Sequence, residues 1–360
     1  MQRKSIYLII AMALLLIAAS ILIYLPKFAH NPASKQGAHN QSMALGVDGS
    51  IMNASQIREL ESFGVHWIRL DISENKSFER YAANLTSQNI SILGIIDYRT
   101  LGVKFKSVAG GLECMSNCNW TLSDWLSNVS KVVNMYPQIH VWEIWNEPQL
   151  PIFQDGFNNG SAYNYFLMLK GAYGIIKQSN SSDTVLCLGG DNIYEGGTGP
   201  WLPGYYWAEA LWRYNASRYC SAISLHAYTG FRYLINQSPA GNGVTMGDIF
   251  NGSLSAYENL TNKPIWITEI GIPSNNGIGL GNMLDNSYNK QALFLNQTFS
   301  LFASKPYMAG IFWFNANGYV DSPYNFSFGL FNRSFSPKPS AYAFKSFSDE
   351  EALLQDSKKA

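Results

Sequence analysis

The sequence predicts a (β/α)8 barrel on the strength of three observations. Eight short apolar runs, rich in Val, Ile and aromatic residues, have the length of buried strands. Several of the segments between them repeat apolar residues at spacings of three and four, as amphipathic helices do. The strand runs are nearly continuously apolar, which is typical of parallel strands covered on both faces. Strands that alternate with helices form βαβ units, and eight such units favour a closed barrel.

The predicted strands follow one another at intervals that leave room for a helix. They cover residues 43–47, 65–72, 90–96, 139–145, 184–189, 221–228, 264–272 and 308–314. Helical patterns are clearest over 122–136, 163–176 and 293–302. We expect the first of these helices to open at Ser123 and Asp124 and to end at Pro137. An open doubly wound sheet is the alternative, but it often carries G-x-G-x-x-G after the first strand, where this chain reads VDGSIMN.

The two ends of the chain differ from the predicted barrel. Arg3 and Lys4 precede Ile6–Leu25, a run of 20 residues without a charge. At a rise of about 1.5 Å per residue, a helix of this length spans about 30 Å, the thickness of a bilayer core. We therefore predict an uncleaved signal-anchor that crosses the membrane, with a cleaved signal peptide as the alternative. The predicted organisation is a transmembrane segment at 1–25, a linker at 26–42, a catalytic barrel at 43–348 and a polar tail at 349–360.

The composition of the chain limits the classes of molecule that it is expected to bind. The formal net charge is zero, and no run rich in Lys and Arg is present, so nucleic acid is excluded as an expected partner. Aromatic residues make up 14% of the chain, and Asn is abundant. Aromatic rings stack on the apolar faces of sugars and amides bond their hydroxyls, so this composition is compatible with a carbohydrate partner.

Sequons and cysteines indicate an exported protein. The pattern Asn-x-Ser/Thr occurs 16 times, where roughly 4 would be expected by chance from the content of Asn, Ser and Thr. The excess predicts a glycosylated surface. Cys114 and Cys118 lie in CMSNC, a polar segment, and are expected to form a local disulfide outside the cell. Cys187 and Cys220 lie at apolar strands, where buried free thiols are the default expectation and a second disulfide is the alternative.

Chemically active residues gather at the carboxyl ends of the predicted strands, where (β/α)8 barrels carry their active sites. Glu147 ends the fourth strand and Glu269 ends the seventh. Two carboxylates suffice to cleave a glycosidic bond, because one protonates the leaving oxygen while the other attacks or stabilises the anomeric carbon. The other strand-end residues are Arg69, Asp71, Asn146, His226, Tyr228, Trp313 and Asn315.

Five of these residues are predicted to bind substrate or to support the glutamates. Arg69 would hold one glutamate ionised, Asn146 would bond a sugar hydroxyl, and Trp313 would offer a stacking face. His226 and Tyr228 are placed in the same site. Glu143 points the same way as Glu147 but deeper in the barrel, and we interpret it as a buried structural carboxylate.

Three segments resemble glycoside hydrolase clan A, the retaining (β/α)8 glycosidases, and most of all its families 5 and 39. WNEP at 145–148 is similar to the acid/base motif of strand 4, and ITEIGIPS at 267–274 to the nucleophile motif of strand 7. The resemblance implies that Glu147 is the acid/base and Glu269 the nucleophile. HAY at 226–228 resembles the strand 6 segment whose aromatic or His bonds the nucleophile. GIPS also resembles the family 17 pattern, which leaves the substrate linkage open.

The expected protein is a membrane-anchored, extracellular β-glycosidase or glycanase that works by double displacement. No cofactor and no metal is expected. A surface transglycosylase shares the covalent intermediate and is the first alternative. A carbohydrate-binding barrel without activity is the second, although the presence of both glutamates argues against it. If the apolar N-terminal segment is cleaved, the protein is secreted rather than anchored.

Overall fold

The computed structural model describes residues 43–108, 111–150, 156–192, 204–229, 233–239, 241, 243–274, 287–317 and 327–359. These residues belong to one compact unit that covers residues 39–360. The predicted transmembrane segment and linker, residues 1–42, lie outside the described residues, so both stay predictions. Within the described ranges, no helix combines the length and hydropathy that a membrane span requires.

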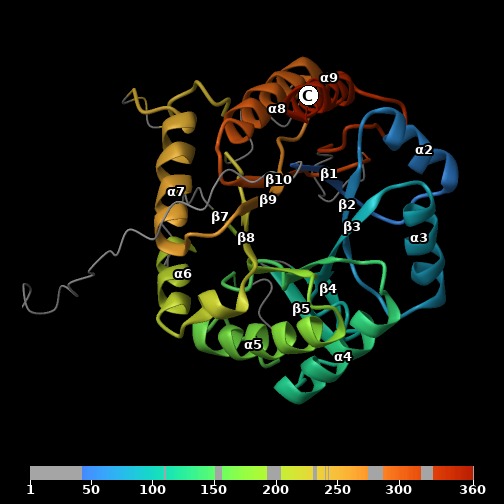
Figure 1. Ribbon diagram of the computed structural model, residues 1–360, viewed down its shortest axis with the longest axis vertical. Coiled ribbons are helices and arrows are strands. Elements are labelled where there is room, and N and C mark those ends of the chain that lie inside the picture. Colours follow the sequence, from blue (N-terminus) through green and yellow to red (C-terminus); the bar gives the residue numbers. More distant parts are fainter. Residues whose placement is uncertain are drawn as a thin grey trace, which may run out of the picture. The chain divides into compact units, whose positions relative to one another are not determined.

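Eight parallel strands close into a barrel, which confirms the predicted (β/α)8 barrel (Figure 1). Around the barrel the order is β1, β2, β3, β6, β7, β8, β9 and β10, which pairs again with β1. Each strand coincides with one of the eight predicted runs. The strands are β1 (Ala44–Asp48), β2 (Trp67–Asp71), β3 (Ser91–Ile96), β6 (Val141–Ile144), β7 (Thr184–Asn192), β8 (Ala222–His226), β9 (Ile265–Ile270) and β10 (Met308–Trp313).

Helices surround the strands (Figure 1). They are α2 (Ala54–Ser62), α3 (Lys76–Ser87), α4 (Leu122–Met135), α5 (Ala162–Ser179), α6 (Gly204–Trp212), α7 (Met246–Thr261), α8 (Tyr288–Ala303) and α9 (Pro339–Lys359), with a short 3-10 helix at Ala216–Tyr219. The three predicted helices correspond to α4, α5 and α8. The predicted start of α4 was two residues late, because Thr121 is the N-cap and exchanges hydrogen bonds with Asp124 in a capping box.

Two segments differ from the expectation. An antiparallel hairpin of β4 (Lys104–Val108) and β5 (Gly111–Ser116) follows β3 and was not predicted, because its strands lack a continuous apolar run. The predicted polar tail continues α9 as far as Lys359. Phe344 and Phe347 attach the earlier part of that helix to Phe299 of α8. The later turns carry mostly exposed polar residues, which is why the sequence lacks an apolar stripe there.

The inside of the barrel changes from apolar to polar along the strands. Ahead of the polar residues along the strands, the interior is filled by a small apolar cluster: Ala44, Leu93, Ile95, Val141, Leu186, Ala222, Trp266 and Phe312. Side chains on one face of a strand recur every second residue. Two residues beyond Val141 lies Glu143, and two and four beyond Ala222 lie Ser224 and His226. The strands therefore deliver polar side chains to the carboxyl end of the barrel above an apolar floor.

Cys187 of β7 and Cys220, which precedes β8, form a disulfide. The default expectation of two free thiols was wrong, because neighbouring strands bring the two Cα atoms to 5.6 Å. Cys118 is also disulfide-bonded. The side chain of Cys114 lies outside the described residues, so its pairing with Cys118 stays a prediction.

Candidate active site

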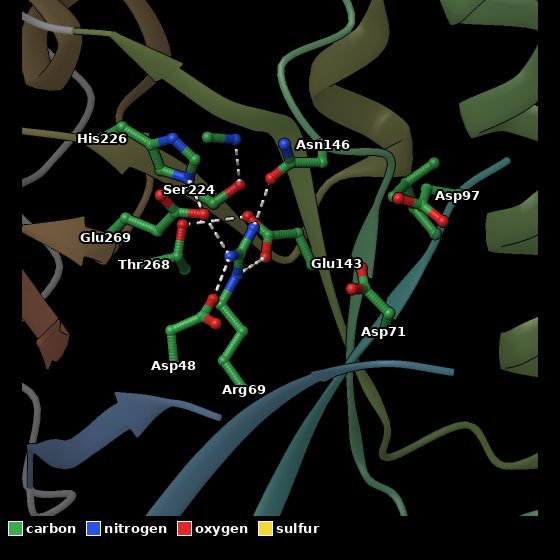
Figure 2. A network of polar contacts seen from close by, with 12 residues as sticks. Asp48, Arg69, Asp71, Asp97, Glu143, Asn146, Ser224, His226, Thr268 and Glu269 are labelled. Atoms are coloured by element: carbon green, nitrogen blue, oxygen red, sulfur yellow. Dashed lines mark hydrogen bonds and ion pairs between the residues drawn. The ribbon is translucent and has the colours of Figure 1, made fainter. Parts of the chain in front are cut away.

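Arg69 lies at the centre of a polar network at the carboxyl end of the barrel (Figure 2). Its Nε donates to Glu143 Oε2 (2.5 Å) and its Nη2 donates to Asn146 Oδ1 (2.8 Å). Nη1 is shared between Glu269 Oε1 (2.5 Å) and Asp48 Oδ2 (2.6 Å). The side chain is 1% exposed. Burial alone would lower the pKa of Arg69, but the three carboxylates raise that pKa well above its usual value.

Glu269, the last residue but one of β9, is surrounded by groups that favour its charged form. Besides Arg69, the Tyr228 hydroxyl donates to Glu269 Oε2 (2.5 Å), and His226 Nε2 lies 3.5 Å from Oε1. Burial would raise the pKa of Glu269. His226, Arg69 and the Tyr228 hydrogen bond outweigh burial and lower that pKa below its usual value. Glu269 is therefore ionised at neutral pH.

Glu147 follows β6 in a loop whose backbone turns sharply. Trp145 and Glu147 have φ values of 69° and 44°, in the left-handed region that residues other than glycine seldom adopt. The Glu147 N–H donates to Gly189 O (2.5 Å), which attaches this loop to β7. Left-handed residues of this kind cost about 1–3 kcal/mol each and persist where the surrounding structure imposes them, often at functional sites. The turn positions the Glu147 side chain, which is 13% exposed.

His226 of β8 lies between the two glutamates. Its Nδ1 is 2.8 Å from Glu147 Oε1, while Nε2 is turned toward Glu269. Burial lowers the pKa of His226, but Glu269 and Glu147 outweigh burial and raise it above its usual value. Gly190 of β7 borders the imidazole so closely that a Cβ there would lie 2.1 Å from Nε2. A glycine at this position, with φ of 79°, is therefore required to seat the histidine.

Asp48 is part of the network although the sequence did not single it out. It ends β1, where it pairs in register with Arg69 of β2. Burial, with smaller contributions from Glu269 and Asp71, raises the pKa of Asp48 to about 8 against the opposing effect of Arg69. The signal that could have found it is the period of two along β1, since Ala44 faces the barrel interior and Asp48 lies four residues later.

Asp71 belongs to a second, neighbouring cluster rather than to the Arg69 network. Arg99 Nη1 donates to Asp71 Oδ1 and to Asp97 Oδ2, both at 2.7 Å. Asp97 is fully buried, and burial raises its pKa to about 7 against the opposing effect of Arg99. Figure 2 shows Asp71 and Asp97 to one side of Arg69.

Seven residues were predicted to catalyse the reaction or to bind substrate. The structure brings six of them together and separates Trp313 from the other six. Those that converge are Arg69, Asn146, Glu147, His226, Tyr228 and Glu269. Arg69 and His226 are buried and bonded to the glutamates, so they are placed to support those carboxylates rather than to form an exposed sugar-binding surface.

Trp313 does not offer the predicted stacking face. It is fully buried against Phe294 and Phe299 of α8, and its Nε1 donates to Phe328 O (2.9 Å). Phe312 lies inside the barrel, so the alternation along β10 turns Trp313 outward. Phe314, the next residue, is partly exposed and has its ring 6.3 Å from that of Tyr228. Phe314, rather than Trp313, therefore lies beside Tyr228, the tyrosine that bonds Glu269.

One family model matches part of the chain, and solved structures share its fold. The family model described as glycosyl hydrolase catalytic core matches residues 172–339. Across the described residues, no three His, Cys, Asp or Glu side chains are grouped so as to hold a metal ion. No curated protein sequence matches the chain.

Several solved structures share the fold. A family 39 glycoside hydrolase from the gut symbiont Bacteroides cellulosilyticus WH2 has a TM-score of 0.60 and 19% identity, with 88% of this chain and 65% of that chain covered. A GH2 β-galacturonidase from Eisenbergiella tayi has a TM-score of 0.57 and 13% identity, covering 86% and 51%. Xylanase 10B from Thermotoga maritima has a TM-score of 0.58 and 15% identity, covering 88% and 98%. The chain thus spans less than two thirds of the first two proteins, and at these identities the similarity establishes the fold.

Proposed function

We propose that this chain is a glycoside hydrolase that cleaves β-linked glycosides by double displacement, with retention of configuration. Support comes from the glycosyl hydrolase catalytic core model that matches residues 172–339 and from the closed barrel of eight parallel strands. The observation that carries the proposal is the unequal setting of two carboxylates on either side of one imidazole. Glu269 is bonded to Arg69 and Tyr228, while the Glu147 carboxylate, within the described part of the chain, is bonded to His226 alone. One carboxylate is held as an anion, and the other is suited to exchange a proton.

In this mechanism Glu269 attacks the anomeric carbon. Its ionised form is the nucleophile, and the lowered pKa keeps that form populated. Glu147 protonates the glycosidic oxygen as the bond to the leaving group breaks, which leaves a glycosyl ester on Glu269. Glu147, now ionised, takes a proton from water as the water attacks the same carbon, and the sugar departs with its original configuration.

In this proposal Asn146 recognises the sugar beside the reacting carbon. Its Oδ1 accepts from Arg69, which orients the amide and leaves the nitrogen to donate to a hydroxyl. Phe314 supplies an apolar ring near Tyr228 and Glu269. The solved structures with this fold include a xylanase and a β-galacturonidase, so the sugar and the linkage are to be found by assay.

The test is an assay of aryl β-glycosides and of β-glucans, mannans and xylans with the body of the protein, residues 38–360. Glu269→Ala and Glu147→Ala should each lose activity, and Glu61→Ala, an exposed glutamate on α2, is the matched control. NMR of the first product should show retention, and azide should restore turnover of an activated aryl glycoside in Glu147→Ala. Inversion, or full activity in Glu269→Ala, would contradict the proposal. Longer products from oligosaccharides would instead identify a transglycosylase.

We also propose that the barrel is a glycosylated domain outside the cell. All the sequons except Asn40 and Asn325 lie within the described residues, and none of their asparagines is buried. The buried asparagines, Asn146, Asn158 and Asn315, belong to no sequon. Several sequon asparagines use Oδ1 as a local acceptor, as Asn53 does at the start of α2. An N-linked glycan attaches to Nδ2 of the asparagine, so a hydrogen bond accepted by Oδ1 is compatible with glycosylation.

Two measurements on the protein from its own source test this location. Glycopeptide mass spectrometry should find sugar on exposed sequons, and membrane fractionation should find the chain in the membrane if residues 1–25 are retained as an anchor. Absence of any glycan mass would reject the glycosylated surface. Release as a soluble form that lacks residues 1–25 would reject the anchor and leave secretion.

A further inference from the structure

Glu143 lies inside the barrel and connects three strands beneath the glutamate pair. Its Oε2 accepts from Arg69 Nε (2.5 Å), and its Oε1 accepts from Thr268 Oγ1 (2.9 Å). The side chain is fully buried. Thr268 immediately precedes Glu269 on β9. One carboxylate on β6 thus contacts both the guanidinium that bonds Glu269 and the residue adjacent to Glu269 (Figure 2).

The contact with Nε matters because a guanidinium is planar and rigid. When Glu143 fixes Nε, the directions of the other two nitrogens are set as well. Nη1 then faces Glu269 and Nη2 faces Asn146. We propose that Glu143 is a positioning residue for the reaction, which holds Arg69 so that Glu269 and Asn146 are oriented together. This inference rests on the proposed function, since that function assigns the two residues their roles.

A purely structural carboxylate is available for comparison at the other end of the barrel. Asp183 directly precedes β7, is 3% exposed, and accepts from Trp142 Nε1 (3.1 Å). It also contacts His140 (2.9 Å). Within the described residues, no hydrogen bond of the Asp183 carboxylate reaches the residues at the carboxyl end of the barrel. A loss of charge at Asp183 should therefore affect stability without affecting the reaction, which makes Asp183→Asn the matched control.

The charge of Glu143 should also influence the ionisation of Glu269. The charged or titratable groups that face this site come from four strands and the loops after them: Asp48 on β1, Arg69 on β2, Glu143 and Glu147 on and after β6, and His226 and Tyr228 on and after β8. Asp71 and Asp97, which are bonded to Arg99, act on the network from one side. Removing the Glu143 charge deletes a like charge near Glu269 and one partner of Arg69. Both changes favour the ionised nucleophile, so the acid limb of kcat/KM should move to lower pH.

Glu143→Gln is the decisive variant. The Gln oxygen can accept from Arg69 Nε while its amide nitrogen donates to Thr268 Oγ1, so both contacts persist without the charge. We expect the acid limb to move to lower pH, with a loss in kcat/KM of less than about tenfold, since the geometry is kept. Glu143→Ala frees Arg69 and should lose about 100-fold. Asp183→Asn should lower Tm and leave the pH profile unchanged.

The outcomes separate the inference from the proposed function. If wild type cleaves an aryl β-glycoside and Glu143→Gln keeps its kcat/KM and pH profile while losing only Tm, Glu143 is structural and the inference fails. If Glu269→Ala is active, the proposed function fails instead. A crystal structure of Glu143→Gln and Glu143→Ala gives a readout without substrate. Arg69 should keep its bond to Asn146 in the first and lose it in the second, and an unmoved Arg69 in the second would overturn the inference.

Discussion

His226 Nδ1 lies 2.8 Å from Glu147 Oε1, so the histidine of β8 is bonded to the predicted acid/base. The resemblance of HAY to the strand 6 segment of clan A had implied a bond to the nucleophile. In this chain Tyr228 makes that bond, and His226 Nε2 stays 3.5 Å from Glu269 Oε1. The imidazole is therefore a link between the two carboxylates, and its exact position should matter for activity.

Gly190→Ala should displace His226 and disable the enzyme while the fold persists. The added Cβ would lie 2.1 Å from Nε2, and the φ of 79° adds backbone strain. We expect kcat/KM to fall by about 100-fold, as small displacements in an active site do. Gly174→Ala is the control, because a Cβ there meets nothing within 4 Å. Equal activity of the two variants would show that the reaction does not depend on the present position of the His226 ring.

Tyr228→Phe should shift the pH profile in the direction opposite to Glu143→Gln. The hydroxyl donates to Glu269 Oε2 at 2.5 Å and stabilises the charged form. Without it the pKa of Glu269 rises, so the ionised nucleophile appears only at higher pH and the acid limb of kcat/KM moves up. Rates measured across pH check this, with the exposed Tyr206→Phe as control. An acid limb that stays in place would contradict the assignment of Glu269.

The Cys187–Cys220 disulfide should stabilise the barrel. It closes a loop with a sequence separation of 33 residues. Cross-links of this size stabilise a protein by about 3–4 kcal/mol, largely by restricting the unfolded chain. The double variant Cys187→Ala, Cys220→Ala should unfold at correspondingly lower urea concentration. Unchanged unfolding midpoints for variant and wild type would mean that the bond contributes nothing measurable.

Lys338 should make stability depend on pH above neutrality. It is 2% exposed, and its Nζ donates to Ser274 Oγ (3.0 Å) and Ser327 O (3.1 Å). Burial lowers its pKa from 10.5 to about 7. Between these two values the unfolded chain holds a proton that the folded protein lacks, so the free energy of unfolding rises with pH across this window.

Lys338→Met should flatten that rise, as measured by urea unfolding from pH 7 to pH 10. The matched control is Lys345→Met, which removes a partly exposed lysine that pairs with Asp349 on α9. The same slope in Lys338→Met and in wild type would show that another group causes the pH dependence.

The pattern of apolar residues determined the barrel. Eight runs with the length and composition of buried strands, separated by segments long enough for helices, allow few other topologies. The same pattern placed Glu147 and Glu269 at strand ends, and the shared end of parallel strands brought them together. The apolar pattern was sufficient for both the barrel and the placement of the two glutamates, because each depends only on the order of residues along the chain.

The tertiary structure decided which neighbours of these residues face the site. Alternation along β10 turns Trp313 outward and leaves Phe314 beside Tyr228, a difference of one residue that an apolar run cannot reveal. The register between β8 and β9 shifts at His226. The adjacent Thr268 and Glu269 both bond into the network of Arg69 and Glu143. If the side chains of β9 alternated strictly between the two faces, either Thr268 or Glu269 would point away from this network. The register shift arises from the pairing between strands, which the sequence of a single strand does not encode.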